Sequence, residues 1–190
     1  MEKYIPDIYQ ENIFKINFDK LKEKGIKTIL LDLDNTILTY KETEPKEEVK
    51  KLIKELKEKN FDLIIYSNGS KKRVDSIKEM LDIDGFYRAR KPLKSGFVSL
   101  INKYKLNIDE VAIIGDQMMT DVLGGNRVGI TTILVNQLDK KEPIWTKFTR
   151  YFENKKYHVD YYLNAFNSET INNEKYEMVI EEEYNKQSNG

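Results

Sequence analysis

Four short apolar segments in the chain predict buried β-strands. They are nearly continuous and rich in β-branched residues, which is typical of parallel strands that are covered on both faces. The four segments are residues 26–33, 61–66, 111–114 and 131–135. The sequence also predicts a fifth short strand near Phe86–Arg88.

Amphipathic segments between these strands predict helices. One stripe with helical spacing consists of Val49, Leu52, Ile53 and Leu56, with lysine and glutamate on the opposite face. Residues 97–104 repeat the spacing, and residues 74–81 carry a looser stripe. Strands that alternate with helices predict right-handed crossovers. The predicted fold class is therefore α/β, a Rossmann-like, mainly parallel five-stranded sheet with helices on both faces.

Composition narrows the protein class further. The chain has 190 residues and no cysteine, which excludes a disulfide scaffold, a cysteine metal site and a thiol nucleophile. Its 32 basic and 32 acidic residues give a formal charge of zero, so we expect no nucleic-acid partner. Neither a membrane-spanning run nor a signal peptide is evident, so the expected location is cytoplasmic.

The character of the sequence changes near residue 140. We predict a catalytic domain over residues 1–165 and a polar, acidic tail over residues 166–190 that lacks stable structure. Residues 140–158 interleave aromatic and basic side chains. We interpret these aromatics mainly as packing of a helix onto the sheet, with peripheral contact to an anionic membrane as the alternative.

Polar side chains follow the predicted strands at the points where they end. The strand at residues 26–33 runs into Asp32 and Asp34, and the strand at residues 61–66 is followed by Ser67. The strand at residues 111–114, the fourth when the short strand near Phe86 is counted, is followed by Asp116. A helix start is predicted to carry Asp121, and Lys91 lies between the second and third helices. Because ligands bind at the carboxyl ends of parallel strands, we expect these side chains to converge at one edge of the sheet.

Clustered carboxylates raise one another's pKa unless a cation lies between them, and an all-oxygen set suits Mg²⁺ better than zinc. An aspartate can also attack phosphorus, and the alternation of Asp32 and Asp34 aims both acids to one side. One acid can attack while the other handles the proton. The hydroxyl of Ser67 and the charge of Lys91 can hold phosphate oxygens.

Two other protein classes use similar residues. Glycosyltransferases hold a metal and a nucleotide sugar with an Asp-x-Asp pair. Phosphorelay receiver domains combine a parallel sheet with clustered acids, a hydroxyl and a lysine, but their phosphoacceptor ends the third strand. The receiver interpretation is disfavoured, because the late acid in this chain, Asp116, follows the fourth strand.

Four motifs in the chain resemble those of the haloacid dehalogenase (HAD) superfamily phosphatases of subclass III. The motifs are Leu31–Thr36, Tyr66–Asn68, Arg90–Pro92 and Gly115–Asp121. The resemblance implies that Asp32 is the nucleophile and Asp34 the general acid/base. It further implies that the phosphoryl group is bound by Ser67, Asn68 and Lys91, and that Mg²⁺ is held by Asp32, the backbone carbonyl of Asp34, and Asp116. Supporting positions are Thr36 and Asp121.

Residues 115–129, together with Tyr4–Asp7, are similar to the YqeG-like branch of that superfamily. Some relatives in this branch are phosphatidylglycerophosphate phosphatases of phospholipid and cardiolipin synthesis. The resemblance therefore implies a lipid head group as substrate, at the cytoplasmic face of the membrane. Soluble sugar phosphates, nucleotides or phosphoprotein are the alternative substrates. An interaction protein with residual phosphatase activity is the alternative from another class.

The spacing of the motifs predicts an open site. Asp34 and Ser67 lie 33 positions apart, and Ser67 and Lys91 lie 24 apart, so each interval has room for about one helix. Neither interval can hold a separate cap domain of about 50 residues. Arg73 follows the Ser67 loop and could reach a substrate phosphate, but it is interpreted as a solvated helix residue.

Overall fold

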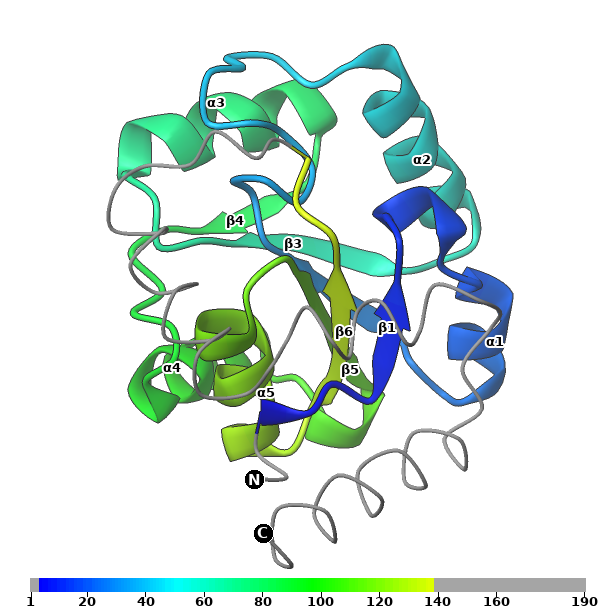
Figure 1. The fold of residues 1–190 in the computed structure, drawn as a ribbon, viewed down its shortest axis with the longest axis vertical. Helices are drawn as coiled ribbons and strands as arrows, with labels where there is room; N and C mark the ends of the chain where they lie inside the picture. Colours follow the sequence, from blue (N-terminus) through cyan, green and yellow to red (C-terminus); the bar gives the residue numbers. More distant parts are fainter. Residues whose placement is uncertain (1–3, 139–190) are drawn as a thin grey trace, which may run out of the picture.

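The computed structural model describes residues 4–138, which form a parallel sheet covered by helices on both faces (Figure 1). Its six strands are β1 (Ile8–Gln10), β2 (Thr28–Leu31), β3 (Asp62–Tyr66), β4 (Asp84–Phe86), β5 (Val111–Gly115) and β6 (Thr131–Val135). Their order across the sheet is β1-β6-β5-β2-β3-β4, and every pair is parallel. The predicted α/β class is confirmed.

Two groups of helices cover the sheet. The first face packs against α1 (Phe18–Glu23), α2 (Glu47–Glu58) and α3 (Lys71–Leu81). The second packs against α4 (Lys94–Tyr104) and α5 (Leu123–Val128). Neighbouring residues of β2 divide between the two sides, since Ile29 and Leu31 belong to the first core and Leu30 to the second. Strands buried on both faces explain why the apolar runs are continuous.

The prediction of five strands was wrong by one, because it missed β1. This strand has three residues, and of these only Tyr9 is buried. It pairs with β6, which lies far away in the sequence. Asp7 adds to this pairing, since its Oδ2 accepts hydrogen bonds from the backbone nitrogen (2.7 Å) and hydroxyl (3.0 Å) of Thr132. A short edge strand of this kind leaves little hydrophobic pattern in the sequence.

The strand order creates a switch point at the centre of the sheet. β2 lies between β5 and β3, with Leu31 in register with Ile114 and with Ile65. After β2 the chain adds β3 and β4 on one side of this strand, whereas β5 and β6 are added on its other side. The residues that follow β2 and β5 therefore emerge side by side, where open parallel sheets bind their ligands.

The intervals between the motifs contain only short elements, as the spacing predicted. α2 and its preceding loop join β2 to β3, and α3 joins β3 to β4. The described chain therefore carries no cap domain at these two positions. The remaining connections include short turns at Ile13–Lys15, Ile108–Glu110 and Met118–Val122.

Three expectations lie wholly or partly outside the described residues. They are the domain boundary at residue 165, the acidic tail, and the role of residues 140–158. Within residues 4–138, no helix combines the length and apolar character needed to span a bilayer.

Candidate active site

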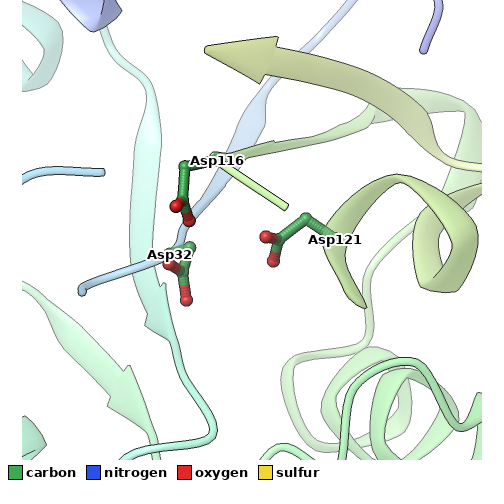
Figure 2. A group of neighbouring side chains, drawn as sticks. All are labelled: Asp32, Asp116 and Asp121. Atoms are coloured by element: carbon green, nitrogen blue, oxygen red, sulfur yellow. The ribbon is translucent and has the colours of Figure 1, made fainter. Parts of the chain in front are cut away.

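Two aspartates leave neighbouring strands at the switch point. The backbone nitrogen of Asp32 donates to the carbonyl of Ile114 (2.9 Å), which continues the ladder by one step beyond β2. Asp116 follows β5 directly. Both side chains are buried, and their carboxylates face one another with that of Asp121 nearby (Figure 2). One oxygen from each of the three acids lies within 4.8 Å of the others.

Asp121 is positioned by a single wide turn after β5. In the π-helical turn Met118–Val122, the carbonyl of Gln117 accepts from the backbone nitrogens of Asp121 (2.9 Å) and Val122 (3.3 Å). The turn bends the chain back, so that Asp121 Oδ2 accepts from the backbone nitrogen of Gln117 at 3.2 Å. The predicted short helix start at this position is therefore a π-turn that leads into α5.

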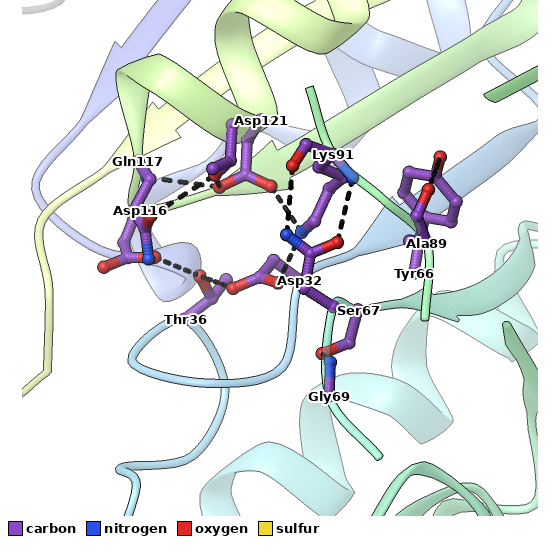
Figure 3. Close-up of polar contacts among 12 residues, drawn as sticks. Asp32, Thr36, Tyr66, Ser67, Gly69, Ala89, Lys91, Asp116, Gln117 and Asp121 are labelled. Atoms are coloured by element: carbon purple, nitrogen blue, oxygen red, sulfur yellow. Dashed lines mark hydrogen bonds and ion pairs between the residues drawn. The ribbon is translucent and has the colours of Figure 1, made fainter. Parts of the chain in front are cut away.

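The side chain of Lys91 lies between two of the acids, Asp32 and Asp121, and forms an ion pair with each (Figure 3). Its Nζ contacts Asp32 Oδ1 at 2.5 Å and Asp121 Oδ1 at 2.6 Å, and all three side chains are buried. The backbone of Lys91 is fixed by Asn68, whose Oδ1 accepts from its nitrogen (2.8 Å) and whose Nδ2 donates to its carbonyl (3.1 Å). Asn68 therefore positions the lysine rather than only lining a phosphate site.

The electrostatics of this cluster favour a cation. Burial is the main cause that raises the pKa of Asp32, and with Lys91 opposing the shift and Asp121 adding to it the pKa is about 7. Burial by itself disfavours the charged ammonium of Lys91, but the carboxylates of Asp121 and Asp32 outweigh it and raise the pKa of Lys91. The lysine is therefore charged, whereas Asp32 is only partly ionised near neutral pH, and a further positive charge nearby would favour its ionised form.

The donor set fits a divalent cation. Lys91 contacts two of the three acids, Asp32 and Asp121, so the three ionised carboxylates and this ammonium together carry two surplus negative charges. Both oxygens of Asp121 already accept hydrogen bonds, from Lys91 and from Gln117. The hydroxyl of Thr36 lies 3.3 Å from Asp32 Oδ2 and 3.5 Å from Asp116 Oδ1. Oxygen ligands of this kind suit a hard ion such as Mg²⁺, and Asp32 and Asp116 are the carboxylates that could hold it.

Ser67 and Asp34 meet beside the carboxylate cluster. Ser67 Oγ accepts from the backbone nitrogen of Gly69 at 3.0 Å, which aims the hydroxyl back over the loop after β3. An ideal Cβ on Gly69 would lie 3.1 Å from Ser67 Oγ and 3.8 Å from Asp34 Oδ2. These two side chains, from different strand ends, therefore border one small space above Gly69.

Arg73 corrects one sequence interpretation. It was interpreted as a solvated helix residue, but its Nε lies 2.8 Å from Asp34 Oδ1 and its Nη2 2.7 Å from the same oxygen. The other guanidinium hydrogen bonds reach the carbonyls of Thr39 and Glu42, both at 3.0 Å. One arginine of α3 thus fixes the second aspartate and the loop that leads to α2. A candidate functional residue was missed here, since 39 positions separate Arg73 from Asp34.

Because Gly115 has no side chain, the carboxylate of Asp121 can lie close to its Cα. A substitution at Gly115 therefore tests this close packing. An ideal Cβ at position 115 would lie 2.2 Å from Asp121 Cγ. We therefore expect Gly115→Ala to push this carboxylate away from Lys91, to lower the free energy of unfolding by about 1–3 kcal/mol and to reduce activity at least about tenfold. Chemical denaturation and phosphate release measure the two effects. Unchanged stability and activity would contradict the close packing described here.

The structure brings most of the predicted residues together. The connected group contains Asp32, Thr36, Lys91, Asp116 and Asp121, with Ser67 and Asn68 at its border. Asp34 lies close enough to raise the pKa of Asp32, but it is bound by Arg73 rather than by Lys91. The roles of these residues in a reaction follow from chemistry and are taken up below.

Comparison with known proteins identifies the family. A haloacid dehalogenase-like hydrolase family model matches residues 2–129. The chain belongs to this family. It is also 37% identical over 150 residues to "Probable phosphatase YqeG" of Bacillus subtilis (strain 168). The aligned residues cover 79% of this chain and 87% of the relative.

Solved structures support the fold of this HAD-family chain. An HAD phosphatase from Thermococcus onnurineus aligns with a TM-score of 0.53 at 17% identity, over 63% of this chain and 90% of that one. An uncharacterized protein from Listeria monocytogenes serotype 4b aligns with a TM-score of 0.52 at 19% identity, over 62% and 85% of the two chains. At these identities the likeness concerns the fold alone.

Proposed function

We propose that this protein is a divalent-metal-dependent phosphatase that hydrolyses phosphomonoesters through an aspartyl-phosphate on Asp32. The observation that carries the proposal is the position of the Asp32 carboxylate at the switch point, 2.5 Å from the ammonium of Lys91. The ammonium can stabilise negative charge that develops on a phosphoryl group there. The similarity to a relative named as a probable phosphatase supports the same reaction.

The first half of the reaction assigns distinct tasks to two aspartates. An oxygen of Asp32 attacks phosphorus, and the bond between phosphorus and the leaving-group oxygen breaks. Asp34, in protonated form, gives its proton to the departing oxygen. Ser67 and Lys91 hold the phosphoryl oxygens during transfer, because both lie at the border of the cluster and can donate hydrogen bonds.

The second half regenerates the enzyme. Asp34, now ionised, takes a proton from a water molecule while the water oxygen attacks the phosphorus of the aspartyl-phosphate. The bond between Asp32 and phosphorus breaks, so inorganic phosphate leaves and both carboxyl groups return to their starting forms. Arg73 holds Asp34 on the side of the cluster where these proton transfers take place.

A bound Mg²⁺ would be held by Asp32, Asp116 and the backbone carbonyl of Asp34. It would supply positive charge that lets Asp32 stay ionised and that weakens the repulsion between this carboxylate and the incoming phosphate.

For the substrate, we propose a phosphomonoester on a lipid head group, namely phosphatidylglycerophosphate, met at the cytoplasmic face of the membrane. Two points support this choice. The motifs resemble those of the branch with such phosphatases, and neither interval between the motifs holds a cap that would restrict the site to small molecules. An open site can accept a phosphate that projects from a larger body.

Phosphate release with Mg²⁺ tests this proposal. Phosphatidylglycerophosphate in mixed micelles is compared with soluble sugar phosphates, nucleotides and a phosphopeptide, with Asp32→Asn as the blank. A preference for the lipid that depends on Asp32 and is lost with a chelator is the expected result. A preference for soluble esters would contradict the lipid assignment alone. No turnover of any ester would contradict the phosphatase itself and favour a docking role.

Replacing Arg73 tests the assignment of Asp34. We expect Arg73→Met to lower kcat/KM, which reports phosphoryl transfer to Asp32, by about 10–100-fold for glycerol 3-phosphate, whose leaving group is poor. The change in kcat/KM with p-nitrophenyl phosphate should be less than about threefold, since that leaving group needs little protonation. Asp34→Asn should show the same dependence of kcat/KM on leaving group, with a larger loss, and should lower kcat for both esters because hydrolysis of the aspartyl-phosphate needs the same residue as base.

The matched control for this experiment is Lys72→Met. Lys72 is the exposed neighbour of Arg73 on α3, and its replacement should leave both substrates unaffected. If Arg73→Met reduced kcat/KM for the two esters equally, the arginine would have a purely structural role.

A further inference from the structure

A hollow lies along the outer edge of the sheet, next to the segment that carries Lys91. It has a volume of about 380 Å³ and lies between the edge strand β4 and helix α4. Figure 1 shows these two elements at the side of the sheet away from β1. The lining includes Phe86, Arg88, Arg90, Ser95, Ser99 and Lys103, none of which serves in the proposed hydrolysis.

The hollow is positively charged. Arg88, Arg90 and Lys103 are all exposed, and none of the described residues that line the space is acidic. Within residues 4–138, no carboxylate forms an ion pair with any of these three side chains. Lys103 is instead held over aromatic rings, 5.8 Å from the centroid of Phe86 and 4.7 Å from that of Tyr104. Three cations therefore face one space with no described counter-charge in contact.

The first turn of α4 adds to this positive field. It contains no acidic residue, and no side chain caps its free backbone nitrogens. Ser95 in this turn and Ser99 one turn later both line the hollow. A helix N-terminus favours anions, and here it opens onto the same space as the arginines.

The hollow and the candidate active site share one short segment. The backbone nitrogen of Arg88 donates to the carbonyl of Gly69 (3.1 Å), and that of Ala89 to the carbonyl of Ser67 (3.0 Å). Ala89 and Lys91 are buried, whereas Arg88 and Arg90 are exposed and have left-handed φ angles of 49° and 57°. Exposed and buried residues thus alternate along this segment, with Lys91 in the catalytic cluster and both arginines lining the hollow.

We propose that this hollow binds a second phosphate group carried by the same substrate molecule. The inference rests on the proposed phosphatase function and extends it to a substrate class: phosphomonoesters with another phosphate a few bonds away, such as the diester of a glycerophospholipid head group. Guanidinium groups bind phosphate through paired hydrogen bonds, and neither arginine is already engaged by a described carboxylate. The hollow selects which monoester is presented to Asp32, and it takes no part in bond cleavage.

Steady-state kinetics of Arg88→Gln/Arg90→Gln test the proposal. The substrates are phosphatidylglycerophosphate in mixed micelles, its soluble deacylated form with both phosphates, and p-nitrophenyl phosphate with one. We expect KM to rise at least about tenfold for both two-phosphate substrates, and all constants for p-nitrophenyl phosphate to stay within about twofold. The soluble substrate separates phosphate binding from attraction to a lipid surface.

The matched control is Lys51→Gln/Lys54→Gln on α2, which removes the same charge from the opposite face of the sheet. These lysines form only exposed pairs with Glu55 and Glu58, so their loss should leave every KM unchanged. If both double variants raised KM alike, general attraction would explain the effect. If the arginine variant changed no KM, or changed it only with lipid, the proposal would be overturned.

Direct binding separates this proposal from the phosphatase function. Glycerophosphoglycerol carries the diester but no monoester, and its binding is measured by calorimetry on the full chain. We expect the wild-type protein to bind it and Arg88→Gln/Arg90→Gln to lose at least about tenfold in affinity. Equal affinity, or no binding by the wild type, would overturn the second phosphate site even if hydrolysis proceeds. Binding that depends on the arginines would support it even if hydrolysis fails.

Discussion

Asp32→Asn is expected to reduce phosphate release by at least about 10³-fold while leaving the fold intact. The amide cannot form an acyl phosphate, but it fills the same volume. Its oxygen can still accept the hydrogen bond from Lys91, while its NH2 group takes the place of the oxygen near Thr36 and can donate to that hydroxyl. Because burial raises the pKa of Asp32 to about 7, ionisation of this carboxyl opposes folding in the metal-free protein, so a neutral amide at this position should not lower the free energy of unfolding through loss of charge. Kinetics and thermal unfolding on the same preparation measure both properties.

Asp109→Asn is the matched control for this variant. Asp109 is an exposed aspartate in the turn before β5, and the same chemical change there should leave activity at the wild-type level. Residual activity of Asp32→Asn above about one per cent of wild type would contradict the assignment of Asp32 as nucleophile.

Lys91→Met is expected to have the largest effect on stability. The variant leaves Asp32 and Asp121 buried without the ammonium that contacts both. Removing one partner from a buried ion pair costs about 3–5 kcal/mol, so the free energy of unfolding should fall by that amount. Turnover should fall as well, because the ammonium that stabilises the transferring phosphoryl group is lost. Urea unfolding and phosphate release provide the two readouts.

A second substitution shows whether this loss comes from charge. Lys91→Met combined with Asp121→Asn removes one of the two stranded carboxylates, so part of the lost stability should return. Added Mg²⁺ should also stabilise the single variant more than the wild type. If the two substitutions were simply additive, the lysine would act through packing rather than through its charge.

The central part of this structure was predictable from sequence because its signals are local. The strands β2, β3, β5 and β6 are continuous apolar runs, and each of the first three is followed by residues of the candidate site. The position of Asp32 and Asp116 at neighbouring strand ends follows from the parallel topology alone. The convergence of these acids with Lys91 was therefore expected and is observed.

Other features were not predictable because they depend on contacts across long stretches of chain. Arg73 follows two lysines in a charged helix and has the pattern of a surface residue, so its bonds to Asp34 leave no local signal. The strand β1 is too short to show periodicity. The hollow beside α4 is lined by Arg88 and Arg90, which both have left-handed φ angles. The sequence does not indicate these turns, because neither position holds a glycine or an asparagine, the residues that usually adopt this conformation.

Trapping the phosphorylated aspartate tests the central claim most directly. Asp34→Asn is mixed with p-nitrophenyl phosphate and Mg²⁺, quenched in acid and reduced with borohydride, which converts an aspartyl-phosphate into homoserine. Because this variant lacks the base for the second step, the intermediate should accumulate. Mass spectrometry of the peptides should then place homoserine at position 32, dependent on substrate. Release of p-nitrophenol without modification of Asp32, or with modification of another residue, would contradict the account.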